Sequence, residues 1–249
     1  MAEEQEHEPN GIRVVVVMNR KGGVGKSTIV KGLASAAAAR GESVTVFDTD
    51  VSGSTIQWMN NAKRLDNWDP NITVIQTMSA ETVKETIKEI YSMPDQEHLI
   101  LIDTFGGGSE AQDEMVQEAH LAIVPTKLSR SDVTETMQTL NWLARLKERV
   151  EDASQVPPVK VLINAVPLRP SEAEEVAMDQ ILRSVSTLTA SVMQRAAYLR
   201  LDLEGALGPI CKNIPNKGIV QYIKAALKEM DDVLTEVDAK IKENANGGA

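Results

Sequence analysis

Cysteine is almost absent from this sequence, with Cys211 as its only example among 249 residues. One thiol excludes a disulfide framework and any four-cysteine metal site within the chain. Histidine is also scarce, and His7, His98 and His120 are too far apart in sequence to form the spacing of a metal site. Aromatic residues make up only 3% of the chain, so a buried core must be built from Val, Ile, Leu, Ala and Met.

Long apolar runs are absent as well, since none approaches the roughly 18 residues that a membrane-spanning helix needs. Segment 1–10 contains four glutamates and lacks a signal-peptide pattern, and we expect it to be a disordered acidic tail. The net charge of −10 argues against a protein that coats nucleic acid through its overall charge, so such binding would need a local basic patch. These features predict a cytoplasmic protein that does not bind membranes.

Short apolar runs alternate with helical segments along the chain. Strands are predicted at 12–18, 44–47, 72–76, 99–102, 121–124 and 159–163, several of them as continuous β-branched runs typical of strands buried on both faces of a parallel sheet. Helices are predicted at 26–40, 55–64, 80–92, 109–118, 132–150, 171–184 and 219–242. This alternation predicts an α/β fold, a doubly wound and mostly parallel sheet flanked by helices. We expect one domain over 11–243 and a polar tail over 244–249.

The segment 19–28 reads N-R-K-G-G-V-G-K-S-T and lies between the first predicted strand and the first predicted helix. A strand, a glycine-rich loop and a helix in this order place backbone N–H groups around the phosphates of a nucleotide. Gly22, Gly23 and Gly25 permit close approach of the backbone, Lys26 can neutralise β- and γ-phosphate charge, and the Ser27 hydroxyl can ligate Mg²⁺.

This loop departs from the usual P-loop spacing, G-x-x-x-x-G-K-[ST], which would require a glycine where the chain has Arg20. A second lysine, Lys21, lies five residues before Lys26.

Carboxylates follow two further predicted strands. Asp48, Thr49 and Asp50 follow the second, and the strand at 99–102 ends at Asp103, in the Walker B form whose aspartate holds the Mg²⁺ shell. Taken alone, an aspartate after a buried strand is also typical of a helix cap or a turn. The phosphate loop upstream favours a functional role.

The segment 20–27 resembles the deviant Walker A box, K-G-G-x-G-K-[ST], of the ParA/MinD superfamily of ATPases. Segments 48–50 and 99–103 resemble that family's second and third boxes. Segment 124–129 is similar to the stretch after the next strand of ParA proteins, and 193–198, with Gly205 shortly after, to a stretch near the family's C-terminus. The resemblance covers about residues 12–240. It implies a P-loop NTPase fold, ATP and Mg²⁺ as cofactors, and an ATPase that is weak alone and stimulated by a partner.

The resemblance also implies roles for particular residues. Lys21 would reach across a dimer interface to the partner's nucleotide, where a cation counters charge on the transferred phosphoryl group. Asp48 would position the attacking water, and Asp103, with Ser27, would act on Mg²⁺. Asn164, after the strand at 159–163, is a candidate for reading adenine, or equally a turn-forming residue. The implied nucleotide contacts of the loop are Gly22, Gly23, Val24, Gly25, Lys26, Ser27 and Thr28.

Two departures concern the loops after the second and third boxes. Family members often have Asp-Pro-Gln where this chain has Asp50, Val51 and Ser52, and proline where it has Phe105. Neither change removes a phosphate, Mg²⁺ or water ligand, so ATP binding is still expected.

The composition argues against several branches of this superfamily. Segment 228–242 is rich in acidic residues and has no aromatics, unlike the basic amphipathic helix of membrane-bound MinD-type relatives. Nitrogenase-reductase relatives need two cysteines per subunit, and segment 1–10 is too short for the helix-turn-helix domain of larger ParA proteins. A small ParA-type partition ATPase is therefore favoured.

By resemblance, such a protein forms an ATP-bound homodimer that binds duplex DNA without sequence preference and associates with the nucleoid. A centromere-binding ParB-type protein stimulates its ATPase. Segment 195–224 contains only two acidic residues, and an ordinary solvated face is as compatible with its composition as a DNA-binding stripe. The candidate DNA-binding residues are Arg195, Arg200, Lys212, Lys217 and Lys224.

Two alternatives stay open. The same switch could position another cargo, such as a chemotaxis cluster or a cell-division inhibitor. A metabolic ATP-dependent synthetase of this fold is less favoured, because no substrate motif is recognisable. An adjacent gene for a small DNA-binding protein with repeat sites would favour partition.

Overall fold

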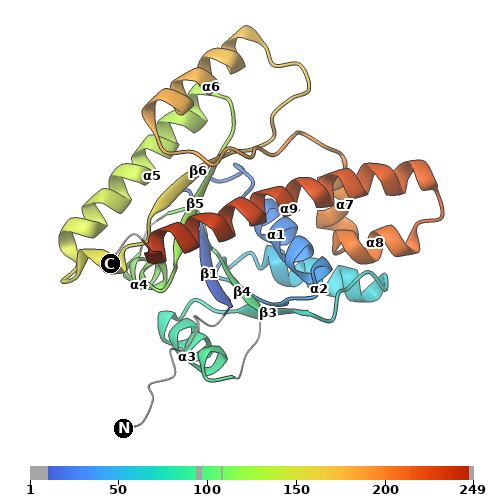
Figure 1. Cartoon of the computed structure of the whole chain (residues 1–249), viewed down its shortest axis with the longest axis horizontal. Coiled ribbons are helices and arrows are strands. Elements are labelled where there is room, and N and C mark those ends of the chain that lie inside the picture. The colour runs from blue at the N-terminus through green and yellow to red at the C-terminus, as the bar shows by residue number, and fades with distance from the viewer. Residues whose placement is uncertain (1–10, 94–96, 108, 247–249) are drawn as a thin grey trace.

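The computed structural model describes residues 11–93, 97–107 and 109–246, which form a sheet covered by helices on both faces (Figure 1). Six strands pair in parallel in the order β3-β2-β4-β1-β5-β6. They are β1 (Ile12–Val17), β2 (Ser43–Asp48), β3 (Ile72–Gln76), β4 (His98–Asp103), β5 (Leu121–Thr126) and β6 (Val159–Ile163). The six predicted strands and the parallel, doubly wound sheet are thereby confirmed. The acidic tail expected at 1–10 lies outside the described residues.

Successive side chains of the central strands enter two separate cores. Val15 and Val17 of β1 belong to one core and Val14 and Val16 to the other, and all four are fully buried. This alternation follows from the pleat of a strand, and it explains why buried parallel strands are apolar throughout.

The helices divide between the two faces of the sheet. One core is covered by α1 (Lys26–Ala39), α2 (Ser54–Arg64), α7 (Ala197–Glu204), α8 (Leu207–Asn213) and α9 (Lys217–Asn246). The other is covered by α3 (Ala80–Tyr91), α4 (Glu110–Gln117), α5 (Arg130–Arg149) and α6 (Glu172–Ser184). A 3₁₀ turn, η1 (Ala153–Gln155), follows α5.

The long helix α9 lies across α1, as Figure 1 shows. Gly32 of α1 makes this approach possible, because a Cβ at this position would lie 2.6 Å from the Met230 sulfur. α9 continues to Asn246, three residues beyond the predicted end of the domain at 243. None of the helices in the described residues combines the length and apolar character that crossing a bilayer requires.

Helices α7 and α8 are absent from the sequence-based prediction. Both are short, neither begins with a side-chain cap, and α8 contains Gly208 and Pro209 in its first turn. Isolated helices of this length are unstable in water. Tertiary packing stabilises them, since Leu201, Leu207 and Ile210 are fully buried against the core that includes α1 and α9.

Candidate functional site

The three predicted boxes meet at the carboxyl edge of the sheet. Val17, the last residue of β1, and Asp48, the last of β2, are both paired with Asp103 of the intervening β4. A cavity of about 480 Å³ opens at this edge, and the loop between β1 and α1 lines it. Ligands of open parallel sheets bind at this position, outside the carboxyl ends of the strands.

The loop conformation depends on two glycines. Gly23 has φ 77° and Gly25 has φ 100°, a region that side chains other than glycine rarely adopt. A Cβ at Gly25 would also lie 2.2 Å from the Asn164 amide nitrogen. Gly25 precedes Lys26, the first residue of α1, so unpaired N–H groups of the helix N-terminus face the cavity, where they can bind phosphate.

Lys26 is buried beneath this loop. Its Nζ donates to the carbonyl oxygens of Asn19 at 3.1 Å and Lys21 at 3.2 Å. Burial lowers the pKa of Lys26, partly offset by the negative charges of Asp103 and Asp50. The ammonium group therefore lies in the cavity wall, where phosphate oxygens can replace its carbonyl partners.

Asp103 and Ser27 have the chemistry of a magnesium site. Asp103 is 1% exposed, and its Oδ1 accepts no hydrogen bond from the described residues, while Oδ2 accepts one from Thr55 at 3.1 Å. Burial raises the pKa of Asp103 to about 6, and the nearby hydroxyl groups of Ser27 and Thr55 oppose that rise. An orphaned carboxylate oxygen beside a hydroxyl fits a hard cation with oxygen ligands, as Mg²⁺ is.

Lys21 lies outside the cavity of its own chain. Its Nζ forms an ion pair with Asp132 Oδ1 at 2.6 Å and a hydrogen bond with Ser131 at 2.7 Å, both at the start of α5. Burial alone would raise the pKa of Asp132, but the hydrogen bonds from Lys21 and Ser129 outweigh it, and the pKa is lowered. The neighbouring Lys26 points into the cavity, so the two lysines of the loop differ in direction.

The two aspartates after β2 have different surroundings. Asp48 is fully buried; its Oδ2 accepts hydrogen bonds from the backbone of Thr55 and Ile56, and its Oδ1 accepts one from the backbone of Asp50. Its carboxylate therefore holds the N-terminus of α2 and is buried away from solvent. Asp50 is half-buried and lines the cavity. The geometry thus argues against the predicted water-positioning role of Asp48 and favours Asp50.

Asn164 is buried between the loop and β6. Its Nδ2 donates to the Val24 carbonyl at 2.7 Å, and its Oδ1 accepts from the Ala165 backbone at 2.8 Å. Both ends of the Asn164 amide are therefore hydrogen-bonded to the backbone. In this conformation Asn164 anchors the phosphate loop. It also lines the cavity, where the sequence placed it.

Residues from later in the chain complete the cavity, and the sequence prediction had not assigned them to it. Lys127, directly after β5, donates from Nζ to the Gly23 carbonyl at 2.6 Å. The sequence could have indicated this residue, because Lys127 follows a predicted strand, as Asp50 and Asp103 do. Met193, Gln194 and Tyr198 also line the cavity.

The candidate DNA-binding residues do not form one free basic stripe. Arg195 lines the nucleotide cavity, and its guanidinium forms an ion pair with Glu229 at 3.0 Å. Arg200 pairs with Glu204 at 3.1 Å. The remaining candidates are exposed: Lys212, Lys217 and Lys224.

Comparisons with known proteins agree with this geometry. The family model described as VirC1 protein matches residues 12–244. "Protein virC1" of Rhizobium rhizogenes is 24% identical over 225 residues, which cover 90% of this chain and 95% of that protein. "Protein ParA" of Rhizobium radiobacter is 26% identical over 188 residues, with coverage of 76% and 81%.

Solved structures share the fold. The McdA(D38A)–ATP complex of Cyanothece superposes with a TM-score of 0.64 at 14% identity, covering 89% of this chain and 96% of that one. The family match extends over nearly the whole chain. It includes the phosphate loop, Asp103 and the sheet that holds both in place. The chain therefore belongs to the VirC1 family, within the ParA/MinD superfamily of P-loop ATPases.

Proposed function

We propose that this protein is an ATP-dependent dimeric switch that hydrolyses ATP, binds duplex DNA when dimeric, and partitions DNA together with a centromere-binding ParB-type protein. The observation that supports it most is the placement of Lys21. This lysine lies in the phosphate loop but points away from the cavity of its own chain, toward α5. A cation in this position is available to the nucleotide of a second copy.

Within one subunit, the loop N–H groups and Lys26 would bind the phosphates, and Ser27 and Asp103 would hold Mg²⁺. The metal, when bound, neutralises charge on the β- and γ-phosphate oxygens. Lys127 adds a further positive charge beside Gly23. Asn164 keeps the loop in the required shape through its hydrogen bond to Val24.

In the dimer, Lys21 leaves its ion pair with Asp132 and binds the phosphates of the partner subunit's ATP. An added cation in trans stabilises the charge that develops on the transferred phosphoryl group, as an arginine finger does. ATP then becomes part of the dimer interface, which links dimer lifetime to hydrolysis. Asp50 orients the attacking water.

Asp50→Ala is expected to leave ATP binding within about threefold and to lower hydrolysis by about 10²-fold or more, which traps an ATP-bound dimer.

Asp48→Ala is expected to act on folding instead, because three backbone N–H groups lose their acceptor. A loss of about 2–4 kcal/mol in the free energy of unfolding follows. Single-turnover hydrolysis and urea denaturation of both variants measure these effects. A stable, ATP-binding but inactive Asp48→Ala protein would restore that residue to the catalytic role.

DNA binding is proposed for the exposed lysines Lys212, Lys217 and Lys224, doubled by dimerisation. Their charges have no ion-pair partner among the described residues, whereas Arg195 and Arg200 are paired. Binding through phosphate contacts alone is independent of sequence and weakens steeply with salt.

The test is light scattering after size exclusion, with Mg²⁺ and either ADP or a slowly hydrolysed ATP analogue, with and without duplex DNA at low salt. The expected result is a monomer with ADP and a dimer that binds DNA with the analogue. A protein that binds the analogue yet stays monomeric and ignores DNA would refute the proposed switch.

A further inference from the structure

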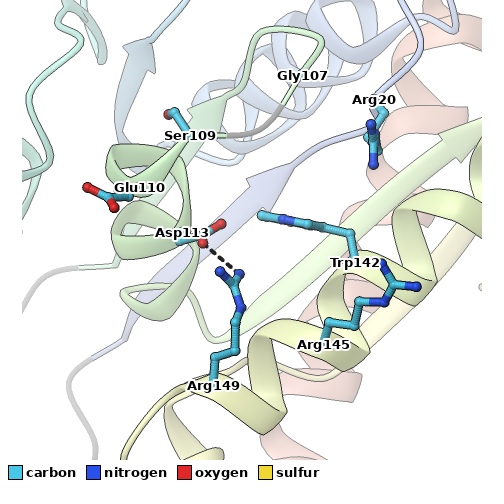
Figure 2. Close-up of a pocket in the computed structure, with 8 residues that line it drawn as sticks. All are labelled: Arg20, Gly107, Ser109, Glu110, Asp113, Trp142, Arg145 and Arg149. Atoms are coloured by element: carbon cyan, nitrogen blue, oxygen red, sulfur yellow. Dashed lines mark hydrogen bonds and ion pairs between the residues drawn. The ribbon is translucent and has the colours of Figure 1, made fainter.

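A second cavity, of about 540 Å³, lies beside the nucleotide site between α4 and α5 (Figure 2). Trp142, Arg145 and Arg149 of α5 form one side, and Glu110 and Asp113 of α4 form the other. Its volume falls within the range of sites that hold small ligands. The two cavities share no lining residue.

Two guanidinium groups border the cavity without a carboxylate of their own. Arg20 and Arg145 are exposed, and no ion pair involves either of them within the described residues. Arg149 differs, because it pairs with Asp113 at 2.8 Å, as the dashed line in Figure 2 shows. A planar guanidinium binds phosphate oxygens in a two-pronged geometry.

Trp142 supplies a flat apolar surface between these charges. Its ring extends from α5 across the cavity toward α4 (Figure 2) and is only partly buried. The other two tryptophans, Trp58 and Trp68, pack edge to face on each other at 4.9 Å in the opposite core. A partly exposed indole flanked by arginines is a surface on which a nucleobase stacks.

Amide side chains lie on the same stripe of α5. Gln138, Asn141, Trp142 and Arg145 line a smaller cavity of about 220 Å³ that shares Trp142, Arg145 and Arg20 with the first. Amides donate to and accept from the edges of bases, so the stripe offers contacts to a base as well as to a phosphate.

We propose that this paired cavity binds a nucleotide unit, with the base stacked on Trp142 and its phosphate held by Arg20 and Arg145. Glu110 and Asp113 on the α4 side repel a continuous track of phosphates but accept hydrogen bonds from base amino groups. The bases of a duplex are stacked inside it and cannot reach a tryptophan. The ligand is therefore an unpaired nucleotide, either free or within a single strand.

The site adjoins the ATP loop but is separate from it. The backbone N–H of Arg20 donates to Thr139 of α5 at 3.2 Å, which holds the start of the loop against this helix. The proposal goes beyond the duplex-binding switch, and it needs neither ATP nor a dimer.

The test is fluorescence anisotropy with a labelled single-stranded oligonucleotide of about 20 nucleotides, without added nucleotide and in a Lys26→Ala background, so that the ATP loop takes no part. Trp142→Leu and Arg145→Ala are each expected to weaken binding about tenfold, whereas Trp142→Phe retains most of it. Lys147→Ala is the matched control, since Lys147 is an exposed cation of the same helix outside the cavity. It should bind within about twofold of the unaltered protein. Thermal melting verifies that each variant is folded.

Competition separates the sources of the ligand. A mononucleotide that displaces the strand at micromolar concentration, with the same dependence on Trp142, indicates a free nucleotide; displacement only by single strands indicates nucleic acid. Both results support the proposal. Equal binding by Trp142→Leu, or a duplex that binds more tightly and without dependence on Trp142, would overturn it. So would displacement by an acidic peptide in preference to every nucleotide.

Discussion

Replacing Lys26 by alanine is expected to weaken ATP binding by about 100-fold or more. The Lys26 ammonium donates to two loop carbonyls at 3.1 and 3.2 Å, and phosphate oxygens are the stronger acceptors for the same two hydrogen bonds. Each charge-assisted hydrogen bond contributes about 1.5–3 kcal/mol, so the loss of two accounts for this factor. Calorimetric titration with ADP and an ATP analogue, in the presence of Mg²⁺, measures it.

The stability of the nucleotide-free Lys26→Ala protein should change little. Burial already disfavours the charged form of this lysine, as its lowered pKa shows, so removing it relieves a desolvation cost while it frees two carbonyl groups. A melting temperature within a few degrees of the unaltered protein is therefore expected. A variant that unfolds would show that Lys26 supports the loop rather than the ligand.

Replacing Lys21 by alanine is expected to leave ATP binding within about threefold and to abolish both dimerisation and hydrolysis. Lys21 binds Asp132 and Ser131 on α5 and does not line its own cavity, so its loss removes no contact to the ATP of the same subunit. A cation supplied in trans contributes about 10³-fold or more to phosphoryl transfer. Calorimetry, light scattering and phosphate release measure the three properties separately.

Asp132→Ala is the matched control for Lys21. It breaks the same ion pair at 2.6 Å but keeps the cation, so it should bind ATP, dimerise and hydrolyse. If Lys21→Ala lost ATP affinity as severely as Lys26→Ala, Lys21 would act on its own nucleotide and the trans role would be wrong. If Asp132→Ala failed to dimerise, the ion pair rather than the cation would be what the dimer requires.

The residues of the phosphate loop were predictable because their chemistry is local. Glycines with positive φ, a lysine and a hydroxyl at fixed spacing between a strand and a helix permit few other structures. Asp103 was predictable for a related reason. A carboxylate that follows an apolar strand lies at the carboxyl end of the parallel strands, whichever position the strand takes in the sheet. Asp103 lies there and is 1% exposed.

Asp48 and Asp50 show where local reasoning ends. They are two residues apart at the end of one strand, and the sequence analysis assigned the attacking water to Asp48. Only the position of α2 distinguishes their surroundings. Its backbone donors engage Asp48, and Asp50 is left at the cavity. Arg195 shows the same limit, because its charge was visible in the sequence while its partner Glu229, from α9, was not.

The sequence by itself determined the parallel sheet, the phosphate loop and the presence of two lysines in that loop. Those features depend on residue type, period and spacing over a few neighbouring positions. Tertiary structure decided the direction of Lys21, the engagement of Asp48, the two short helices α7 and α8, and the cavity at Trp142. Each of these depends on side chains or helices that are distant in sequence, such as Asp132 from Lys21, and their contacts arise only when the sheet brings its helices together.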